Sequence, residues 1–256
     1  MKPQTENPEF DNVDPLQEAY RETIANIPER IASLRNQNAA LLCIDMQYLD
    51  AAEGYGVFAD ATSSGVPLEA QEYYFTTLAQ YVLPNVRRLQ ECFRANDLEV
   101  IHTRIQSLTM DGRDRSPGHK RLGLHAAPGS KEAEFLPEVA PSGDELVINK
   151  TASGVFTSTN LEFILRNMGI DALFVTGVYS NECVSTTVRD ASDLGFLVTV
   201  IDDACTTVTR ELHDFTIAGL RDRYARILST DETIGEISSE LGAQTQAAGP
   251  NQMITD

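Results

Sequence analysis

Short runs of apolar residues recur along the chain, and longer stretches with helical spacing separate them. The apolar runs are Ala39–Ile44, Leu98–His102, Glu145–Ile148, Ala172–Thr176, Leu197–Ile201 and Ala225–Leu228. Near-continuous apolar runs of this length are typical of strands in a parallel sheet that is covered on both faces. We therefore predict six strands in one mainly parallel sheet.

The intervening stretches have the spacing of amphipathic helices, and Gly169 and Gly195 act as stop signals after two of them. They lie near Gln71–Asn96, Thr159–Met168, Glu182–Leu194 and Thr209–Arg221. Strands that alternate with helices favour an α/β fold with a doubly wound sheet and helices on both faces. The predicted fold class is thus a Rossmann-like three-layer sandwich.

A further helical pattern over residues 14–35 precedes the first strand. Asp14 is its predicted N-cap and Pro15 its first residue, while Pro28 is expected to kink or divide it. We expect this helix to pack against the rest of the chain or against a subunit partner, because it has an apolar face.

The length of 256 residues fits one large domain. The predicted organisation is an N-terminal arm and helix over residues 1–37, one domain over 38–241 and a polar tail over 242–256. Two segments, 49–70 and 105–143, fit neither strand nor helix and each follows an apolar strand. We interpret them as loops at the rim of the sheet, where such folds form binding pockets.

Charge and composition limit the function classes. The chain has 20 Lys and Arg residues against 38 Asp and Glu, for a formal net charge of -18. This charge repels nucleic acid and anionic lipid headgroups, although it does not exclude an anionic small substrate. The apolar runs are too short to span a membrane, and no secretory leader is recognisable. We expect a cytoplasmic protein whose partner is a small molecule.

Three reactive side chains occupy the ends of predicted strands or the turn after one. Asp45 and Lys150 each follow directly on an apolar run, and Cys183 begins a helix after the turn that follows Thr176. If the strands are neighbours, a carboxylate, an ammonium and a thiol meet at one edge of the sheet. The helix start and Lys150 are expected to lower the thiol pKa, and Asp45 is the candidate acid and base.

The turn before Cys183 is also the candidate oxyanion hole. Backbone N–H groups at a helix start are natural donors to a developing negative charge. We name those of Tyr179 and Cys183.

Three blocks in this order resemble the isochorismatase-like cysteine hydrolases: residues 44–47 (IDMQ), 150–161 (KTASGVFTSTNL) and 176–191 (TGVYSNECVSTTVRDA). The similarity covers roughly residues 38–230. It implies a six-stranded parallel sheet and a catalytic triad of Asp45, Lys150 and Cys183. Members of this family often hold the peptide bond before the residue at Tyr179 in cis.

The region after the second strand reads VIHTRIQS and lacks the acid and two histidines of the nicotinamidase metal site, so we expect no metal and no cofactor. The motifs look more like the branch containing biuret hydrolase, N-carbamoylsarcosine amidase and ureidoacrylate amidohydrolase. That resemblance implies hydrolysis of a small amide or ureido C–N bond through a thioester, with release of ammonia. The candidate substrate-binding residues are Gln47, Arg104, Phe156 and Tyr179, and Arg104 suits a substrate carboxylate.

Other interpretations stay open. Cys183 could be an inert buried thiol and Asp45 and Lys150 a structural ion pair. The fold could instead hydrolyse an isochorismate-like enol ether with Asp45 as the acid, or bind without turnover. We expect His119 and His125 in a solvated loop and His213 on the surface. The amphipathic N-terminal helix favours a homodimer or homotetramer.

Overall fold

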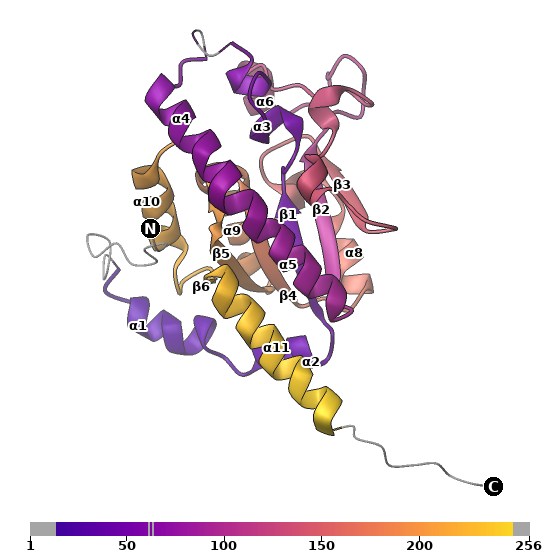
Figure 1. Cartoon of the computed structure of the whole chain (residues 1–256), viewed down its shortest axis with the longest axis vertical. Coiled ribbons are helices and arrows are strands. Elements are labelled where there is room, and N and C mark those ends of the chain that lie inside the picture. The colour runs from indigo at the N-terminus through magenta and orange to yellow at the C-terminus, as the bar shows by residue number, and fades with distance from the viewer. Residues whose placement is uncertain (1–13, 61, 63, 248–256) are drawn as a thin grey trace, which may run out of the picture.

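The computed structural model describes residues 14–60, 62 and 64–247, and it contains a six-stranded sheet in which all paired strands run parallel (Figure 1). The strand order is β3-β2-β1-β4-β5-β6. The strands are β1 (Ala39–Ile44), β2 (Glu99–Ile105), β3 (Leu146–Lys150), β4 (Ala172–Val178), β5 (Leu197–Thr206) and β6 (Arg226–Leu228). The predicted fold is confirmed, and β2 to β5 extend beyond their apolar runs at the carboxyl ends.

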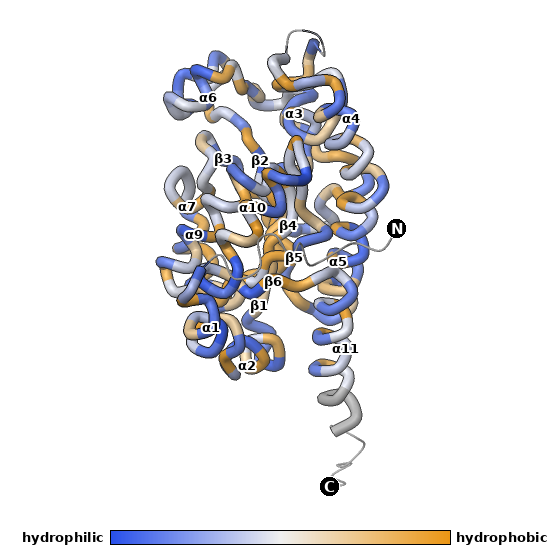
Figure 2. The backbone as a smooth tube through the Cα atoms, turned by 90° about the vertical axis from the view of Figure 1, so that its left-hand side faces the viewer, coloured by the Kyte–Doolittle hydropathy of each residue, from blue (hydrophilic) through white to orange (hydrophobic). Residues whose placement is uncertain are grey.

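Helices cover both faces of the sheet. One apolar cluster joins the strands to α7 (Val155–Ser158), α8 (Leu161–Asn167), α9 (Ser185–Asp193) and α10 (Arg210–Leu220). The other joins them to α2 (Glu29–Arg35), α4 (Leu68–Thr77), the π-helical turn η3 (Leu78–Val82), α5 (Leu83–Ala95) and α11 (Thr230–Ala247). Figure 2 shows hydrophobic residues gathered along the central strands between these layers.

The alternation of side chains along β1 explains why both clusters exist. Leu42 and Ile44 belong to the first cluster, whereas Leu41 and Cys43 belong to the second. Successive strand residues point to opposite faces, so a strand buried on both sides must be apolar at every position. This is the pattern that the sequence of β1 shows.

The strand order reverses between β1 and β4, which is where doubly wound sheets bind their ligands. Gly177 of β4 pairs with Ile44 of β1 and has a φ of 116°. A Cβ atom at this position would lie 2.0 Å from the carbonyl oxygen of Ile44. Only glycine permits this close approach of the two strands beside the site.

The N-terminal segment packs on its own domain. It consists of α1 (Gln17–Tyr20), the π-helical turn η1 (Arg21–Ala25) and α2, and Pro28 divides it as predicted. The buried Arg30 guanidinium donates to the carbonyl oxygen of Val198 at 2.9 Å, and Arg21 pairs with Asp222 at 3.2 Å. These contacts fasten the segment to β5 and to the turn before β6.

The C-terminal helix α11 was not expected. It extends to Ala247, so residues 242–247 of the predicted polar tail are helical. The rest of that tail and the predicted arm over residues 1–13 lie outside the described residues.

The two predicted rim loops lie together at the carboxyl edge of the sheet. The first contains α3 (Tyr48–Ala51) and the 3-10 turn η2 (Gly56–Phe58), and the second contains α6 (Pro117–Arg121) and the 3-10 turns η4 (Lys131–Ala133) and η5 (Pro137–Val139). A backbone hydrogen bond of 2.9 Å from Tyr48 to Glu134 joins them. Figure 1 shows α3 and α6 beyond the ends of the strands.

Candidate active site

Asp45, Lys150 and Cys183 meet at the carboxyl edge of the sheet. Asp45 follows β1, Lys150 is the last residue of β3, and Cys183 lies in the π-helical turn η6 (Ser180–Val184) that follows β4. The Lys150 Nζ atom lies 2.8 Å from Asp45 Oδ2 and donates to Cys183 Sγ at 3.2 Å. Because β2 separates β3 from β1, the long lysine side chain is what brings the ammonium to Asp45.

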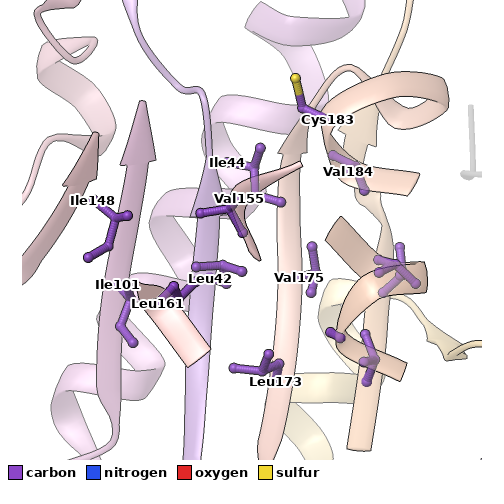
Figure 3. Packing of buried hydrophobic residues seen from close by; sticks show 14 of the residues in the cluster. Leu42, Ile44, Ile101, Ile148, Val155, Leu161, Leu173, Val175, Cys183 and Val184 are labelled. Carbon is purple, nitrogen blue, oxygen red and sulfur yellow. The ribbon is translucent and has the colours of Figure 1, made fainter. Parts of the chain in front are cut away.

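Figure 3 shows the Cys183 thiol pointing away from the apolar cluster below it. Ile44, Val155 and Val184 pack beneath the thiol and belong to that cluster. The nucleophile candidate therefore sits on a packed floor, which fixes the position of its sulfur.

The neighbouring strand β2 holds the Asp45 carboxylate in place. The Asp45 backbone N–H donates to the Thr103 carbonyl at 3.0 Å, and the Thr103 hydroxyl donates to Asp45 Oδ1 at 3.4 Å. Asp45 itself has a φ of 55°, which turns the chain out of β1 and toward α3.

Lys150 is held as an ammonium. Its Nζ also donates to the Ala152 carbonyl at 3.1 Å, and the side chain is fully buried. Burial alone lowers the pKa of Lys150, but the charge and hydrogen bond of the Asp45 carboxylate are the main effects that outweigh burial and raise it above its ordinary value. A fixed positive charge thus lies between the carboxylate and the thiol.

The predicted lowering of the thiol pKa was wrong. Burial raises the pKa of Cys183 well above its ordinary value, Asp45 and Asp50 add to this effect, and only Lys150 opposes it. Burial also raises the pKa of Asp45, against the attraction of Lys150, which makes its carboxylate a stronger base than an exposed aspartate. The resting pair is therefore a thiol beside a base.

Hydrogen bonds also fix the turn that carries Cys183. The Val178–Tyr179 peptide bond is cis. Ser180 Oγ lies 2.7 Å from His213 Nδ1, and His213 Nε2 lies 2.8 Å from Asp202 Oδ1. His213 is buried rather than on the surface as predicted, because this chain of hydrogen bonds ties α10 and β5 to the turn that carries Cys183.

The predicted substrate-binding residues have protein partners in the structure. The Gln47 amide donates to the carbonyls of Ile105 and Glu132, and its oxygen accepts from the Ile105 N–H. The Arg104 guanidinium donates to Asn149 at 2.7 Å and to Ala133 at 2.8 Å. Gln47 thus ties the chain just before the first rim segment to the second rim segment, and Arg104 secures the second.

The two aromatic candidates pack against different apolar clusters, Phe156 against the first and Tyr179 against the second. Phe156 of α7 stacks on Phe196 with 5.7 Å between ring centroids. Tyr179 directly precedes η6, and its hydroxyl donates to the Asp50 backbone carbonyl at 3.0 Å. Contact of either ring with a substrate stays a prediction.

The sequence interpretation missed Asp50 and misplaced His119. Asp50 is buried in α3, and its Oδ2 has no hydrogen-bond partner. His119 was expected in solvent but is buried, and its Nδ1 also has no partner. Burial together with the charges of Lys150 and Arg115 lowers the pKa of His119 to about 4. Both residues lie in rim segments whose conformation the sequence pattern does not reveal.

Residues 39–232 match the family model described as the isochorismatase domain. The chain belongs to the isochorismatase family. The three sequence blocks that suggested this family contain Asp45, Lys150 and Cys183, the side chains that meet in the structure.

Relatives within the isochorismatase family include two amide-hydrolysing enzymes. N-carbamoylsarcosine amidase from Arthrobacter sp is 29% identical over 60% of this chain and 60% of its own length. Ureidoacrylate amidohydrolase RutB from Serratia proteamaculans is 27% identical over 71% of this chain and 75% of its own length. A cysteine hydrolase from Pseudomonas syringae pv. phaseolicola shares the fold, with a TM-score of 0.66 and 19% identity over 85% of this chain and 98% of its own.

This family and these relatives identify the protein as a hydrolase. Among residues 14–60, 62 and 64–247, no group of three or more His, Cys, Asp and Glu side chains is arranged to hold a metal ion. In the same residues, every helix is too short or too polar to cross a membrane.

Proposed function

We propose that this protein hydrolyses the C–N bond of a small amide or carbamoyl/ureido compound, with Cys183 as nucleophile, Asp45 as base and acid, and Lys150 between them. The observation that carries the proposal is the position of Lys150 Nζ, which contacts both the Asp45 carboxylate and the Cys183 sulfur. Ion pairs that only support structure do not need a thiol as a third partner.

The first chemical step is attack on the carbonyl carbon. Because the Cys183 pKa is raised by burial, the thiol must lose its proton during attack, and Asp45 is the adjacent acceptor. The sulfur then bonds to carbon, and the carbonyl oxygen becomes negative. The backbone N–H groups of Tyr179 and Cys183 are the proposed donors to that oxygen.

The second step releases the amine. Asp45 passes its proton to the leaving nitrogen, the C–N bond breaks, and ammonia departs from a thioester on Cys183. A water molecule then attacks the thioester carbon while Asp45 accepts its proton, and the sulfur leaves with that proton to restore the thiol. Lys150 keeps its charge throughout and stabilises the anionic carboxylate and sulfur in turn.

The alternative hydrolysis of an enol ether uses Asp45 as an acid and needs no thiol. The hydrogen bond from Lys150 to Cys183 favours the amide reaction, because it would serve no purpose for an enol ether. The non-catalytic alternative conflicts with a buried site that holds the three groups together.

Ammonia release from a panel of biuret, N-carbamoyl amino acids, ureidoacrylate, nicotinamide and simple amides tests the proposal. We expect turnover of a ureido compound that Cys183→Ser abolishes and the matched control Cys92→Ser retains, since Cys92 lies on α5 away from the site. Undiminished turnover in Cys183→Ser would refute the thiol mechanism. A well-folded wild type that releases no ammonia from any compound would refute amide hydrolysis.

We propose a cytoplasmic enzyme that needs no cofactor and acts on a small molecule without nucleic acid or membrane partners. A homodimer or homotetramer stays a prediction, and light scattering tests it. The N-terminal segment supports the homo-oligomer less than expected, because Arg30 and Arg21 bind this segment to the rest of the same chain.

A further inference from the structure

Asp50 is a buried carboxyl group beside the triad that the proposed mechanism does not use. It lies in α3, and its Oδ2 has no hydrogen-bond partner. Buried polar atoms in proteins nearly always have partners, so an unpartnered one at a reaction site is a candidate to bind a ligand. Asp50 is 3% exposed and Cys183 is 4% exposed, so the two residues are buried to a similar degree.

Two tyrosines fix the backbone of Asp50 relative to the nucleophile. The hydroxyl groups of Tyr74 and Tyr179 both donate to the Asp50 carbonyl oxygen, at 2.7 and 3.0 Å. The two rings lie against each other with 5.2 Å between centroids. Since Tyr179 directly precedes the turn that carries Cys183, the position of Asp50 is coupled to that of the thiol.

The surroundings of Asp50 favour its uncharged form. Burial raises the pKa of Asp50 well above its ordinary value, the carboxylates of Asp45 and Glu182 raise it further, and only Lys150 opposes them. The groups that face Asp50 are Asp45 after β1, Lys150 of β3, Glu182 and Cys183 of η6, Tyr179 before it and Tyr74 of α4. An uncharged carboxyl group presents an O–H donor and a C=O acceptor side by side.

We propose that Asp50 is a specificity-determining residue that binds the uncharged N–H group next to the scissile carbonyl of a ureido substrate. This inference rests on the proposed amide hydrolysis and narrows its substrate class. The Asp50 C=O accepts from the ureido N–H, and its O–H donates to the next polar oxygen of the substrate. A simple amide has a CH₂ group at that position and would leave Asp50 unpartnered.

A matched pair of compounds isolates this contact. Biuret and malonamide differ only in an N–H against a CH₂ between the two carbonyl carbons, and N-carbamoylglycine and succinamate differ in the same way. The ratio of kcat/KM within a pair, compared between variants, cancels the intrinsic reactivity of the two compounds. We expect the wild type to favour the ureido member.

Three variants then test the role of Asp50. In Asp50→Leu the preference should fall at least about 10-fold, mainly through KM, because the N–H loses its acceptor. In Asp50→Asn it should stay within about 3-fold of wild type, since an amide keeps one donor and one acceptor. Asp171→Asn changes a half-buried aspartate that also has a buried oxygen without a partner, but at the opposite end of β4, and it should leave the preference unchanged.

Infrared spectroscopy gives a readout that does not depend on activity. The Cys183→Ser protein should show a protonated-carboxyl band at neutral pH that Asp50→Asn removes and that added biuret or N-carbamoylglycine shifts. A missing band, or an unshifted one, overturns the inference even if Asp50→Leu fails to fold. Equal preferences for the ureido compound in Asp50→Leu and in the wild type also overturn the inference about Asp50. Ammonia release would persist in that case, so the proposed amide hydrolysis would stand.

Discussion

Replacing Lys150 by methionine is the perturbation with the clearest expected result. Methionine keeps most of the length of the unbranched side chain but removes the charge, and it leaves the Asp45 carboxylate without its cation. The side chains of Lys150 and Asp45 are 0% and 1% exposed, so water cannot replace the lost partner. Breaking such a pair costs about 3–5 kcal/mol, a large share of the roughly 5–15 kcal/mol that stabilises an ordinary protein.

Urea unfolding followed by circular dichroism measures this loss. With a slope of about 2 kcal/mol per molar urea, the midpoint should fall by about 2 M at pH 7. The double variant Lys150→Met with Asp45→Asn should recover most of the loss, because no unpaired charge is left. All variants that lack Lys150 or Asp45 should be inactive.

The pH dependence of the stability of Lys150→Met tests whether an unpaired Asp45 charge causes the loss. Without Lys150 the pKa of folded Asp45 rises further above its unfolded value, so the folded state binds more protons between the two values. The deficit in stability should therefore be full above the folded pKa and shrink as the pH falls through it. A Lys150→Met protein with a wild-type midpoint at pH 7, or a double variant as unstable as the single one, would refute the reasoning.

Three further predictions concern the same region. The kcat/KM of the wild type should rise with pH as Asp45 ionises. Because burial raises the Asp45 pKa, the midpoint of this rise should lie above the ordinary aspartate pKa of about 3.9. A midpoint at or below that value argues against Asp45 as the base. Gly177→Ala should destabilise the folded protein by more than about 3 kcal/mol in thermal unfolding, because the new Cβ would meet a β1 carbonyl. Gly195→Ala is the control, because the space around Gly195 is open, and it should cost about 1 kcal/mol. His213→Asn should lower the free energy of unfolding by about 1–3 kcal/mol, because it leaves Ser180 unpartnered. Adding Ser180→Ala should lower it little further, and additive losses would contradict an energetic coupling between the two residues.

The layered fold was accessible from sequence because the strands contain near-continuous apolar runs. A strand such as β1, buried on both faces, leaves an uninterrupted run that no surface strand needs. The carboxyl ends of β2, β3 and β5 were missed because polar residues begin there, and the end of β4 was missed because Gly177 suggested a turn.

Helix α11 was missed although its start carries a signal. Ser229 and Glu232 cap each other, with Glu232 Oε2 accepting from the Ser229 N–H at 2.7 Å and Ser229 Oγ accepting from the Glu232 N–H at 3.2 Å. This Ser-x-x-Glu spacing marks a helix start. The polar sequence beyond it concealed the helix, because Ile237 is the one fully buried apolar side chain among residues 230–242.

The members of the candidate site were predictable, but their charge states were not. Asp45, Lys150 and Cys183 stand out because each lies where a purely structural residue would be apolar. Whether a thiol ionises depends on the balance between burial and Lys150, and burial is a property of the folded chain that the sequence pattern does not give. Asp50 and His119 escaped for the same reason, since only the folded rim brings them to the triad.

The reversal of strand order between β1 and β4 divides the chemistry between two consecutive parts of the chain. The first part, through β3, supplies Asp45 and Lys150, and the second, from β4 onward, supplies Cys183. Two separately expressed fragments would pair along β1 and β4. The first would lack Cys183, and the second would lack Asp45 and Lys150. Ammonia release by such a pair would report their association, so the topology makes this chain a natural candidate for a split-enzyme sensor.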